Sequence, residues 1–349
     1  MDYIIFVKTF LLMKKHFPLL VKISLISVYL IFLAGSVVRM TGSGMGCPDW
    51  PKCFGYYIPP TSEEQITWQP NSEYEKGMII IKNEVLFVAE NNIKTTNEFN
   101  SNNWSKYTKH SYAKFNKYHT WTEYINRLSS ALAGIPFLLL IFVSLSFWKE
   151  KKQITILAFG AFLLMLFEAW LGKTVVDTNL KPTIITIHMV AGLIIIALLL
   201  WLLHIVSDRK KTTYKYNSLF SKLVIISAVF SLIQIAMGTQ VRQFIDEQVK
   251  LYGFENKQFS LLKPSFKFYF HRSFTIAIVL INLGMFYLNQ IKNLGFKLVN
   301  WIVFLIFLET ITGILMYYAE FPLGTQAVHL LSGAILFGLQ FYLWLQSRN

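Results

Sequence analysis

Charged residues are scarce in this sequence. Asp, Glu, Lys and Arg make up only 15% of its 349 residues, whereas a soluble domain carries about 25%. Hydrophobic residues account for 54% and aromatic residues for 16%. This composition excludes an ordinary soluble protein, because apolar runs of about 20 residues are typical of helices that cross a membrane.

Acidic residues are scarcer than basic ones, with 19 Asp and Glu against 33 Lys and Arg and a net charge of +14. In a soluble protein this excess would suggest a nucleic-acid partner. Here the basic residues lie in the loops between the apolar runs, which is the positive-inside pattern of membrane proteins. We therefore expect a lipid bilayer around the chain and no nucleic-acid partner.

Only two cysteines are present, Cys47 and Cys53, and both lie outside the apolar runs. Their spacing in CPDWPKC is not the C-x-x-C of zinc sites or dithiol redox sites. A disulfide can form if this loop faces an oxidising compartment. For these two cysteines we favour a structural disulfide within the loop, or two free thiols, over a redox role.

The N-terminal segment lacks a small-residue cleavage site after the first apolar run, and it lacks an Arg- and Ser-rich transit segment. We therefore expect a retained anchor in a bacterial cell (inner) membrane rather than in an organelle. Met13 begins the stretch MKKHFPLL, which has the character of a translation start. We expect translation to begin there rather than at Met1.

Eight apolar runs predict eight transmembrane helices and an all-α membrane protein. Four runs lie in each half, and an even number per half gives both halves the same orientation about an axis along the membrane normal. We expect two pseudo-symmetric four-helix bundles, residues 1–210 and 211–349. The runs are Leu19–Val38, Tyr124–Trp148, Ile154–Val176, Pro182–His204, Leu219–Val241, Phe268–Leu288, Leu298–Tyr318 and Leu323–Leu345.

Lysine and arginine are concentrated in the short loops after the second, fourth and sixth runs. The positive-inside rule then predicts that both termini are cytoplasmic and that the loops 40–121 and 242–267 face outward. Within the long outer loop, Met78–Val88 is predicted to form a short hairpin. Thr41–Pro60 is rich in Gly, Pro and aromatic residues and is predicted to be an ordered cap over the outer end of the first bundle.

An internal duplication organises the sequence. Both halves contain the same four residue types in the order Glu, Gly, His and Gly. In each half the first Gly lies four residues after Glu, His lies sixteen residues after that Gly, and the second Gly lies four residues after His. Upstream, His271–Arg272 matches Asn126–Arg127, and Gly238–Arg242 matches Gly35–Arg39. The second half therefore carries a pair of histidines, and the first half carries one. The matched sets are Glu168, Gly172, His188 and Gly192 in the first half and Glu309, Gly313, His329 and Gly333 in the second.

His271 and His329 are predicted to lie at similar depth on parallel helices, in the outer part of the bilayer. Two histidines on facing helices of a four-helix bundle can ligate one haem iron from both sides. The glycines one turn after His188 and His329 would leave room for a flat macrocycle, or would serve close helix packing. Zinc or a di-iron site would need more carboxylates per bundle. The arginines expected to meet haem propionates are Arg272 and Arg242 in the second half and Arg39 and Arg127 in the first.

The first half keeps His188 but has Asn126, a poor iron ligand, where the repeat predicts histidine. A macrocycle bound there would have one histidine and an open face, which suits chemistry or ligand exchange. Glu123, on the same helix face as Asn126, is predicted to be a general base or proton acceptor, or equally an interfacial carboxylate near a helix N-terminus. Glu168 and Glu309 are expected to form hydrogen bonds between the repeats.

At these residues the sequence resembles the haem A synthase family over nearly its whole length. The resemblance implies a membrane enzyme that oxidises one methyl group of haem O to a formyl group by successive hydroxylations, giving haem A for terminal oxidases. It implies that haem O is the substrate of the first half and that haem b lies between His271 and His329. The stretches that carry it are VRMTGSGMGCPDWPKCFGYYIPP (Val38–Pro60), EYINR (Glu123–Arg127), LGKTVVDTNLKPTIITIH (Leu171–His188), HR (His271–Arg272) and GTQAVHLLSG (Gly324–Gly333).

The family's E-x-x-H motif implies a catalytic role for Glu123, and the cysteine pair of its outer loop is matched by Cys47 and Cys53. Asn126 departs from the histidine of that motif, and we expect the site to work with His188. Haem O synthase and an unidentified electron acceptor are the expected partners. The alternatives are a non-catalytic bis-His cytochrome b and a transporter built from parallel repeats, which would need broken helices or midplane charges that are mostly absent.

Overall fold

The computed structural model describes residues 14–108, 115–207, 214–253, 259 and 263–348. The translation start predicted at Met13 lies outside these residues. Within them, eight helices are long and apolar enough to cross a membrane, which confirms the predicted eight-span, all-α fold. They are α2 (Phe17–Met40), α3 (Lys117–Ser144), α4 (Lys152–Asp177), α5 (Pro182–Val206), α6 (Ser218–Tyr252), α7 (Phe266–Ile291), α8 (Leu298–Tyr318) and α9 (Thr325–Ser347).

Local sequence explains several helix starts. Pro18 and Pro182 stand in the first turn of α2 and α5, where the missing N–H of proline costs no hydrogen bond. The side chains of Asn116 and Asn217 accept hydrogen bonds from backbone N–H groups at the starts of α3 and α6. The chain therefore enters these four spans at residues that are suited to a helix N-terminus.

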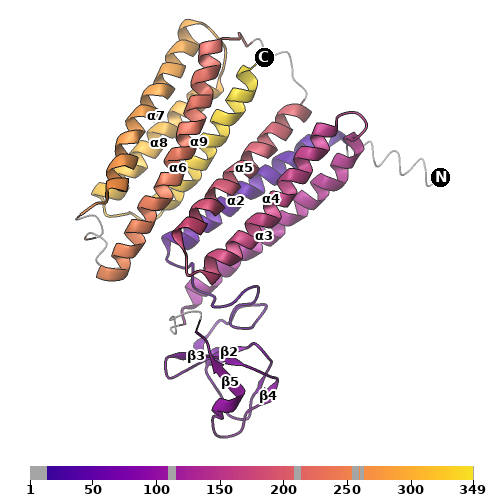
Figure 1. Cartoon of the computed structure of the whole chain (residues 1–349), viewed down its shortest axis with the longest axis vertical. Coiled ribbons are helices and arrows are strands. Elements are labelled where there is room, and N and C mark those ends of the chain that lie inside the picture. Colours follow the sequence, from indigo (N-terminus) through magenta and orange to yellow (C-terminus); the bar gives the residue numbers. More distant parts are fainter. Residues whose placement is uncertain (1–13, 109–114, 208–213, 254–258, 260–262, 349) are drawn as a thin grey trace, which may run out of the picture.

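The helices form two four-helix bundles that lie side by side (Figure 1). In the first bundle α2 and α4 each pack against α3 and α5, so α3 and α5 lie on one diagonal. The second bundle repeats this arrangement, because α6 and α8 each pack against α7 and α9. The positions that the duplication matches therefore fall on corresponding diagonals, α3 with α5 and α7 with α9.

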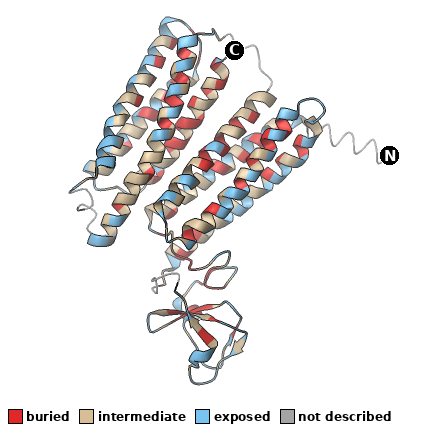
Figure 2. Cartoon of the chain, in the orientation of Figure 1, coloured by how far each residue is buried: buried red, intermediate tan, exposed pale blue. Residues whose placement is uncertain are grey.

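Helix α9 joins the two bundles. It packs against α2 and α5 as well as against its neighbours in the second bundle. Its Phe337 belongs to the buried core of the first bundle, whereas its Leu336 belongs to that of the second. Buried residues lie between the helices, and the outward faces carry exposed apolar side chains such as Leu30 and Phe142, as expected of surfaces that face lipid (Figure 2).

The long outer loop folds into a small β unit at the end of the first bundle, away from the α3–α4 connection (Figure 1). Strands β2 (Ile79–Lys82) and β3 (Val85–Ala89) pair antiparallel, which confirms the predicted hairpin. Strand β5 (Trp104–Lys106) extends this sheet beside β3. A second, two-stranded sheet joins β1 (Glu73–Tyr74) to β4 (Ile93–Lys94). The polar composition of this loop did not predict the folded unit, whose cores contain several packed aromatic rings.

Thr41–Pro60 is an ordered cap over the start of α3, as predicted. A disulfide joins its two cysteines, Cys47 and Cys53. The indole Nε1 of Trp121 donates a hydrogen bond to the backbone oxygen of Pro60 at 3.2 Å. The cap is therefore closed on itself by a covalent bond and attached to the helix by hydrogen bonds.

Gly46 brings this cap into direct contact with the α3 backbone. Its carbonyl oxygen accepts a hydrogen bond from Oγ1 of Thr120 at 2.8 Å. A Cβ atom at this position would lie only 2.5 Å from the carbonyl carbon of His119. Backbone cannot yield as the end of a flexible side chain can, so the contact admits only glycine.

Helix α6 is longer than the apolar run predicts. The run ends at Val241 and predicts a loop over 242–267, but the helix continues to Tyr252. Asp246 lies one turn after Arg242 and pairs with it, and it also pairs with Arg39 of α2. These ion pairs favour the helical conformation beyond the apolar run, so the prediction of a loop directly after Val241 was wrong.

Replacing Gly46 by alanine tests the contact between the cap and α3. We expect Gly46→Ala to lower stability by about 1 to 3 kcal/mol, because overpacking forces the cap away from the helix. The measurement is the thermal unfolding midpoint in detergent. Gly134→Ala is the control, since a Cβ atom at that α3 position meets nothing within 4 Å. Equal midpoints for the two variants would contradict the close approach.

Candidate haem-binding sites

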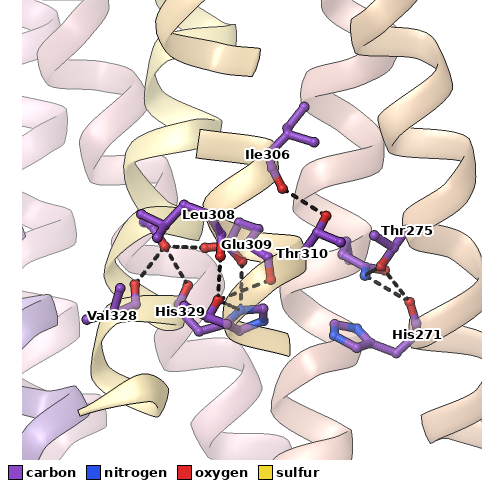
Figure 3. A network of polar contacts seen from close by, with 11 residues as sticks. His271, Thr275, Ile306, Leu308, Glu309, Thr310, Val328 and His329 are labelled. Carbon is purple, nitrogen blue, oxygen red and sulfur yellow. Dashed lines mark hydrogen bonds and ion pairs between the residues drawn. The ribbon is translucent and has the colours of Figure 1, made fainter. Parts of the chain in front are cut away.

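In the second bundle, His271 of α7 and His329 of α9 lie in the second turn of two diagonal helices. Figure 3 shows their imidazole rings pointing toward one another across the bundle interior. Both side chains are partly buried. The structure therefore brings together the two histidines that the sequence pairs.

The ring of His329 is oriented by two residues of α8. Its Nδ1 lies 2.8 Å from Oγ1 of Thr312 and 3.2 Å from Oε2 of Glu309. The single hydroxyl hydrogen of Thr312 is directed to the backbone oxygen of Leu308 at 2.8 Å, so this hydroxyl accepts from Nδ1–H. The network assigns the proton to Nδ1, which leaves the Nε2 lone pair free for a metal.

His271 is held differently. Its backbone oxygen accepts a hydrogen bond from Nε2 of Gln234 at 2.9 Å, and the same amide donates to Thr275 at 2.8 Å. The ring lies against Gly238 of α6, where a Cβ atom would be 3.2 Å from Cε1. Its Nδ1 is buried and has no hydrogen-bond partner among the described residues. A buried imidazole that points toward a second histidine is a residue that would hold a haem iron (Figure 3).

In the first bundle, His188 of α5 repeats the arrangement of His329. Its Nδ1 lies 2.6 Å from Oε2 of Glu168 on α4. On the diagonal helix α3, the buried Oδ1 of Asn126 has no hydrogen-bond partner within the described ranges. Gly35 of α2 faces Asn126, with a Cβ atom there 3.8 Å from Oδ1, just as Gly238 faces the His271 ring. The two bundles thus share the arrangement of helices and of the facing glycine, and they differ in that one has Asn126 where the other has His271.

The expected role of the two deeper glutamates was wrong. Glu168 and Glu309 do not bond the repeats to each other, because each contacts the histidine of its own bundle. Glu309 also accepts a hydrogen bond from Ser332. The carboxylates lie between neighbouring helices, within reach of the imidazoles on α5 and α9, and this proximity could not be read from spacing.

The glycines one turn after the histidines do not open space for a macrocycle, which corrects a second expectation. A Cβ atom at Gly333 would lie 3.5 Å from Glu309, and one at Gly192 would lie 2.9 Å from the Phe32 ring and 3.9 Å from Glu168. Both glycines therefore allow the carboxylates and a neighbouring ring to approach the helix. Their purpose is close packing around the Glu–His contact.

Glu123 is buried at the junction between α3 and the cap, with 3% of its surface exposed. Its Oε1 accepts from Arg127 at 2.5 Å, and its Oε2 accepts from the backbone N–H of Cys47 at 2.9 Å. Arg127 also donates to the backbone oxygens of Asp49 at 2.7 Å and Lys52 at 3.1 Å. Oε2 of Glu123 and the Arg127 guanidinium, which Oε1 holds, thus attach the disulfide loop to the helix that carries Asn126.

The cap itself is internally fixed by buried polar groups. The Asp49 carboxylate accepts from the backbone N–H groups of Phe54 and Gly55 at 2.5 and 2.9 Å. Burial raises the pKa of Asp49 above its usual value, and these hydrogen bonds oppose the rise. Burial also raises the pKa of Tyr107 to about 12, so the phenol remains protonated and donates to the backbone oxygen of Pro48.

The four candidate arginines are not equivalent. Arg39 of α2 and Arg242 of α6 both pair with Asp246 at 2.7 Å, and Arg242 also donates to the backbone oxygen of Arg39 at 3.1 Å. Arg127 belongs to the cap contact. Arg272 is exposed, with its guanidinium carbon 5.2 Å from the centroid of the Tyr269 ring. The structure therefore does not bring Arg272 to the cluster that Arg242 forms.

Asp246 is a functional candidate that the sequence reasoning missed. It pairs with one arginine from each bundle. The two arginine side chains are about three-quarters buried, and the Asp246 side chain is about two-thirds buried. The i, i+4 spacing from Arg242 could have revealed one of its two partners. The other partner, Arg39, lies in a different bundle and could not be inferred from spacing.

Within the described residues, no group of three or more His, Cys, Asp and Glu side chains is arranged to hold a bare metal ion. The polar chemistry of the bundles instead centres on imidazoles, of which His188 and His329 have a carboxylate beside them and His271 has none among the described residues. Such a donor set fits a group that brings four of its own ligands, such as a haem.

Comparison with known proteins identifies the family. The family model described as cytochrome oxidase assembly protein, COX15-CtaA, matches residues 19–99 and 78–341. The chain belongs to this family. The match spans both bundles, and it confirms the family resemblance carried by the sequence motifs.

Curated relatives agree with this membership. A protein named heme A synthase from Shewanella oneidensis is 23% identical over 95% of this chain and 97% of its own length. Heme A synthases from Alkalihalophilus pseudofirmus and Wolbachia pipientis wMel are 23% and 24% identical, over 95% and 93% of this chain. These relatives match 97% and 91% of their own lengths, so the whole chain is compared with whole proteins.

Replacing Asp246 by asparagine tests the link between the bundles. We expect Asp246→Asn to lower the free energy of unfolding by about 1 to 3 kcal/mol, because two partly buried guanidinium groups lose their shared carboxylate. The thermal midpoint in detergent reports the loss. The exposed neighbour Glu247→Gln, which bonds only Gln243 among the described residues, is the matched control. An unchanged midpoint for Asp246→Asn would show that the cluster adds no stability.

Proposed function

We propose that this protein is a haem A synthase, an oxidoreductase that converts one methyl group of haem O to a formyl group by successive hydroxylations. The observation that carries the proposal is the difference between two bundles of the same design. One has a pair of facing histidines, and the other has a single histidine opposite Asn126. Family membership and relatives named heme A synthase support the same function.

The second bundle, residues 211–349, is the proposed cofactor site. His271 and His329 would hold haem b, which would supply one-electron transfer when bound. Glu309 and Thr312 keep the His329 ring in one tautomer and orientation. Gly238 leaves space for the His271 ring. In this arrangement neighbouring residues already position the two histidines that would hold the cofactor.

The first bundle, residues 1–210, is the proposed site for substrate haem O. His188 would bind the substrate iron, and Glu168 orients its ring through Nδ1. Asn126 leaves the opposite face without a second histidine. Conversion of a methyl to a formyl group withdraws four electrons, so an electron acceptor is required, and haem O synthase is the proposed source of substrate.

Glu123 and the arginines complete the proposed site. Glu123 would accept a proton near the substrate, and the contact with Arg127 holds this carboxylate in place. Arg39 and Arg242, close to Asp246 between the bundles, would pair with haem propionates. Arg272 would pair with a propionate only from the exposed side of α7 on which it lies. The positive-inside pattern supports a bacterial inner-membrane location with cytoplasmic termini.

A bis-His cytochrome b that only transfers electrons is the alternative. It accounts for His271 and His329 but gives no purpose to the matched Glu168–His188 pair in the first bundle. The transporter alternative has less support, because the described spans are continuous helices and their prolines, except Pro136, lie at span starts. The comparisons favour the synthase over both.

Chromatography of extracted haems tests the function. We expect protein purified from cells that supply haem O to contain haem B together with haem A or a hydroxylated haem O. His188→Ala should lose the haem A fraction and keep haem B, whereas His271→Ala should lose haem B. Haem B alone in the unaltered protein would support the cytochrome, and no haem at all would refute both assignments.

The roles of Glu123 and Asn126 are separated by substitution. Asn126→Ala should retain much of the turnover, because asparagine supplies no strong iron ligand, while Glu123→Ala should lose nearly all of it. The measurement is the rate of haem A formation from haem O in membranes, normalised to haem B content. Near-complete loss in both variants would count against this division of roles. Retention in Glu123→Ala would remove the proposed proton acceptor.

A further inference from the structure

A hollow of about 440 Å³ lies where the first bundle ends, on the side away from the β unit. It is formed by the start of α2, the α3–α4 connection, the start of α4 and the end of α5. Three lysines, one glutamate and five apolar side chains line it. None of these residues belongs to the proposed haem sites.

The rim of this hollow is positively charged. Its lysines are Lys14, Lys15 and Lys151, and its one acidic residue is Glu150. Glu150 pairs with Lys14 at 2.6 Å. Lys15 and Lys151 are exposed and have no ion pair among the described residues. The hollow therefore offers two unpaired ammonium groups to an anion.

The wall beneath the lysines is apolar. Nζ of Lys14 lies 4.7 Å from the centroid of the Phe147 ring, which packs at 5.0 Å against the fully buried Phe17. Ile154 and Ile205 contribute aliphatic surface. The hollow stands at the level where four spans leave the apolar region of the bilayer. Positive charge above an apolar wall at this depth matches the boundary between a lipid headgroup and its acyl chains.

The corresponding corner of the second bundle is built differently. When the repeats are aligned on Gly35–Arg39 and Gly238–Arg242, Phe220 takes the place of Phe17 and Asn217 takes the place of Lys14. Asn217 caps α6 by accepting from the backbone N–H of Phe220 at 2.9 Å.

Aromatic rings fill that corner instead. Phe296 stacks on Phe220 at 4.9 Å and on Tyr214 at 4.5 Å. The second bundle thus packs stacked rings at this corner, where the first bundle has the lysine-rimmed hollow.

We propose that this hollow binds an anionic phospholipid, with the phosphate paired by Lys15 and Lys151 and an acyl chain against the apolar wall. Basic pockets at membrane level recognise anionic headgroups through charge, and each lysine adds to the affinity. The apolar wall favours a lipid over a free inorganic anion. The site lies at the far end of α2 and α5 from the cap, so it is separate from the substrate chemistry.

Native mass spectrometry of the full-length protein in nonionic detergent tests the site. Dioleoylphosphatidylglycerol should bind about tenfold or more tightly than dioleoylphosphatidylcholine. Lys15→Gln with Lys151→Gln should abolish most of this preference. The matched control removes two exposed lysines from the second bundle, Lys292→Gln with Lys297→Gln, and should keep it.

A second variant leaves every charge in place. Ile205→Trp should fill the hollow and weaken phosphatidylglycerol binding although all lysines remain. Unchanged binding in both the lysine and the tryptophan variants would overturn the proposal, as would equal binding of the two lipids by the unaltered protein. Displacement of phosphatidylglycerol by millimolar inorganic phosphate would assign the lysines to a free anion and would equally overturn the lipid site.

Discussion

Inside a lipid bilayer a polar side chain has no water to bind, so its partner must come from the protein. This constraint explains the contact that both bundles share, a carboxylate on one helix against the Nδ1 of an imidazole on the next. Glu168 lies 2.6 Å from Nδ1 of His188, and Glu309 lies 3.2 Å from Nδ1 of His329. With Nδ1 facing the carboxylate, Nε2 is the ring nitrogen that would be left for a haem iron.

Other features follow from accommodating this pair. Gly192 and Gly333 lack side chains where the glutamates approach the neighbouring helix. Thr312 supplies a hydrogen-bond partner to the ring nitrogen of His329, and Ser332 donates to one carboxylate oxygen of Glu309. Gly192 and Gly333 therefore allow the buried carboxylate and imidazole to pack, and they do not make room for a ligand.

The two bundles share one design, and the tasks proposed for them differ because a few residues differ. Asn126 stands where the second bundle has His271, and the glycine that faces each of them is retained. The first bundle also carries the cap, which Glu123 and Arg127 attach to α3 through backbone groups of the disulfide loop. The proposed catalytic site and the outer cap thus lie on the same bundle, and the proposed haem b site lies on the other.

The bundles depend on each other for stability as well as for chemistry. Helix α9 contributes Phe337 to the core of the first bundle, and Asp246 of α6 forms ion pairs with one arginine from each bundle. The proposed propionate-binding arginines are therefore also the residues that tie the bundles together. Binding in one site would alter the charge balance of a cluster that the other bundle shares.

The sequence by itself determined the eight spans, the duplication and the identity of the histidines, because hydrophobic runs and fixed spacing are local properties of the chain. It also predicted the hairpin and the cap from turn residues. Only the tertiary structure decided what lies beside each polar group. The partners of Glu168, Glu309 and Arg39 come from other helices, and spacing within one segment carries no information about the distance between segments.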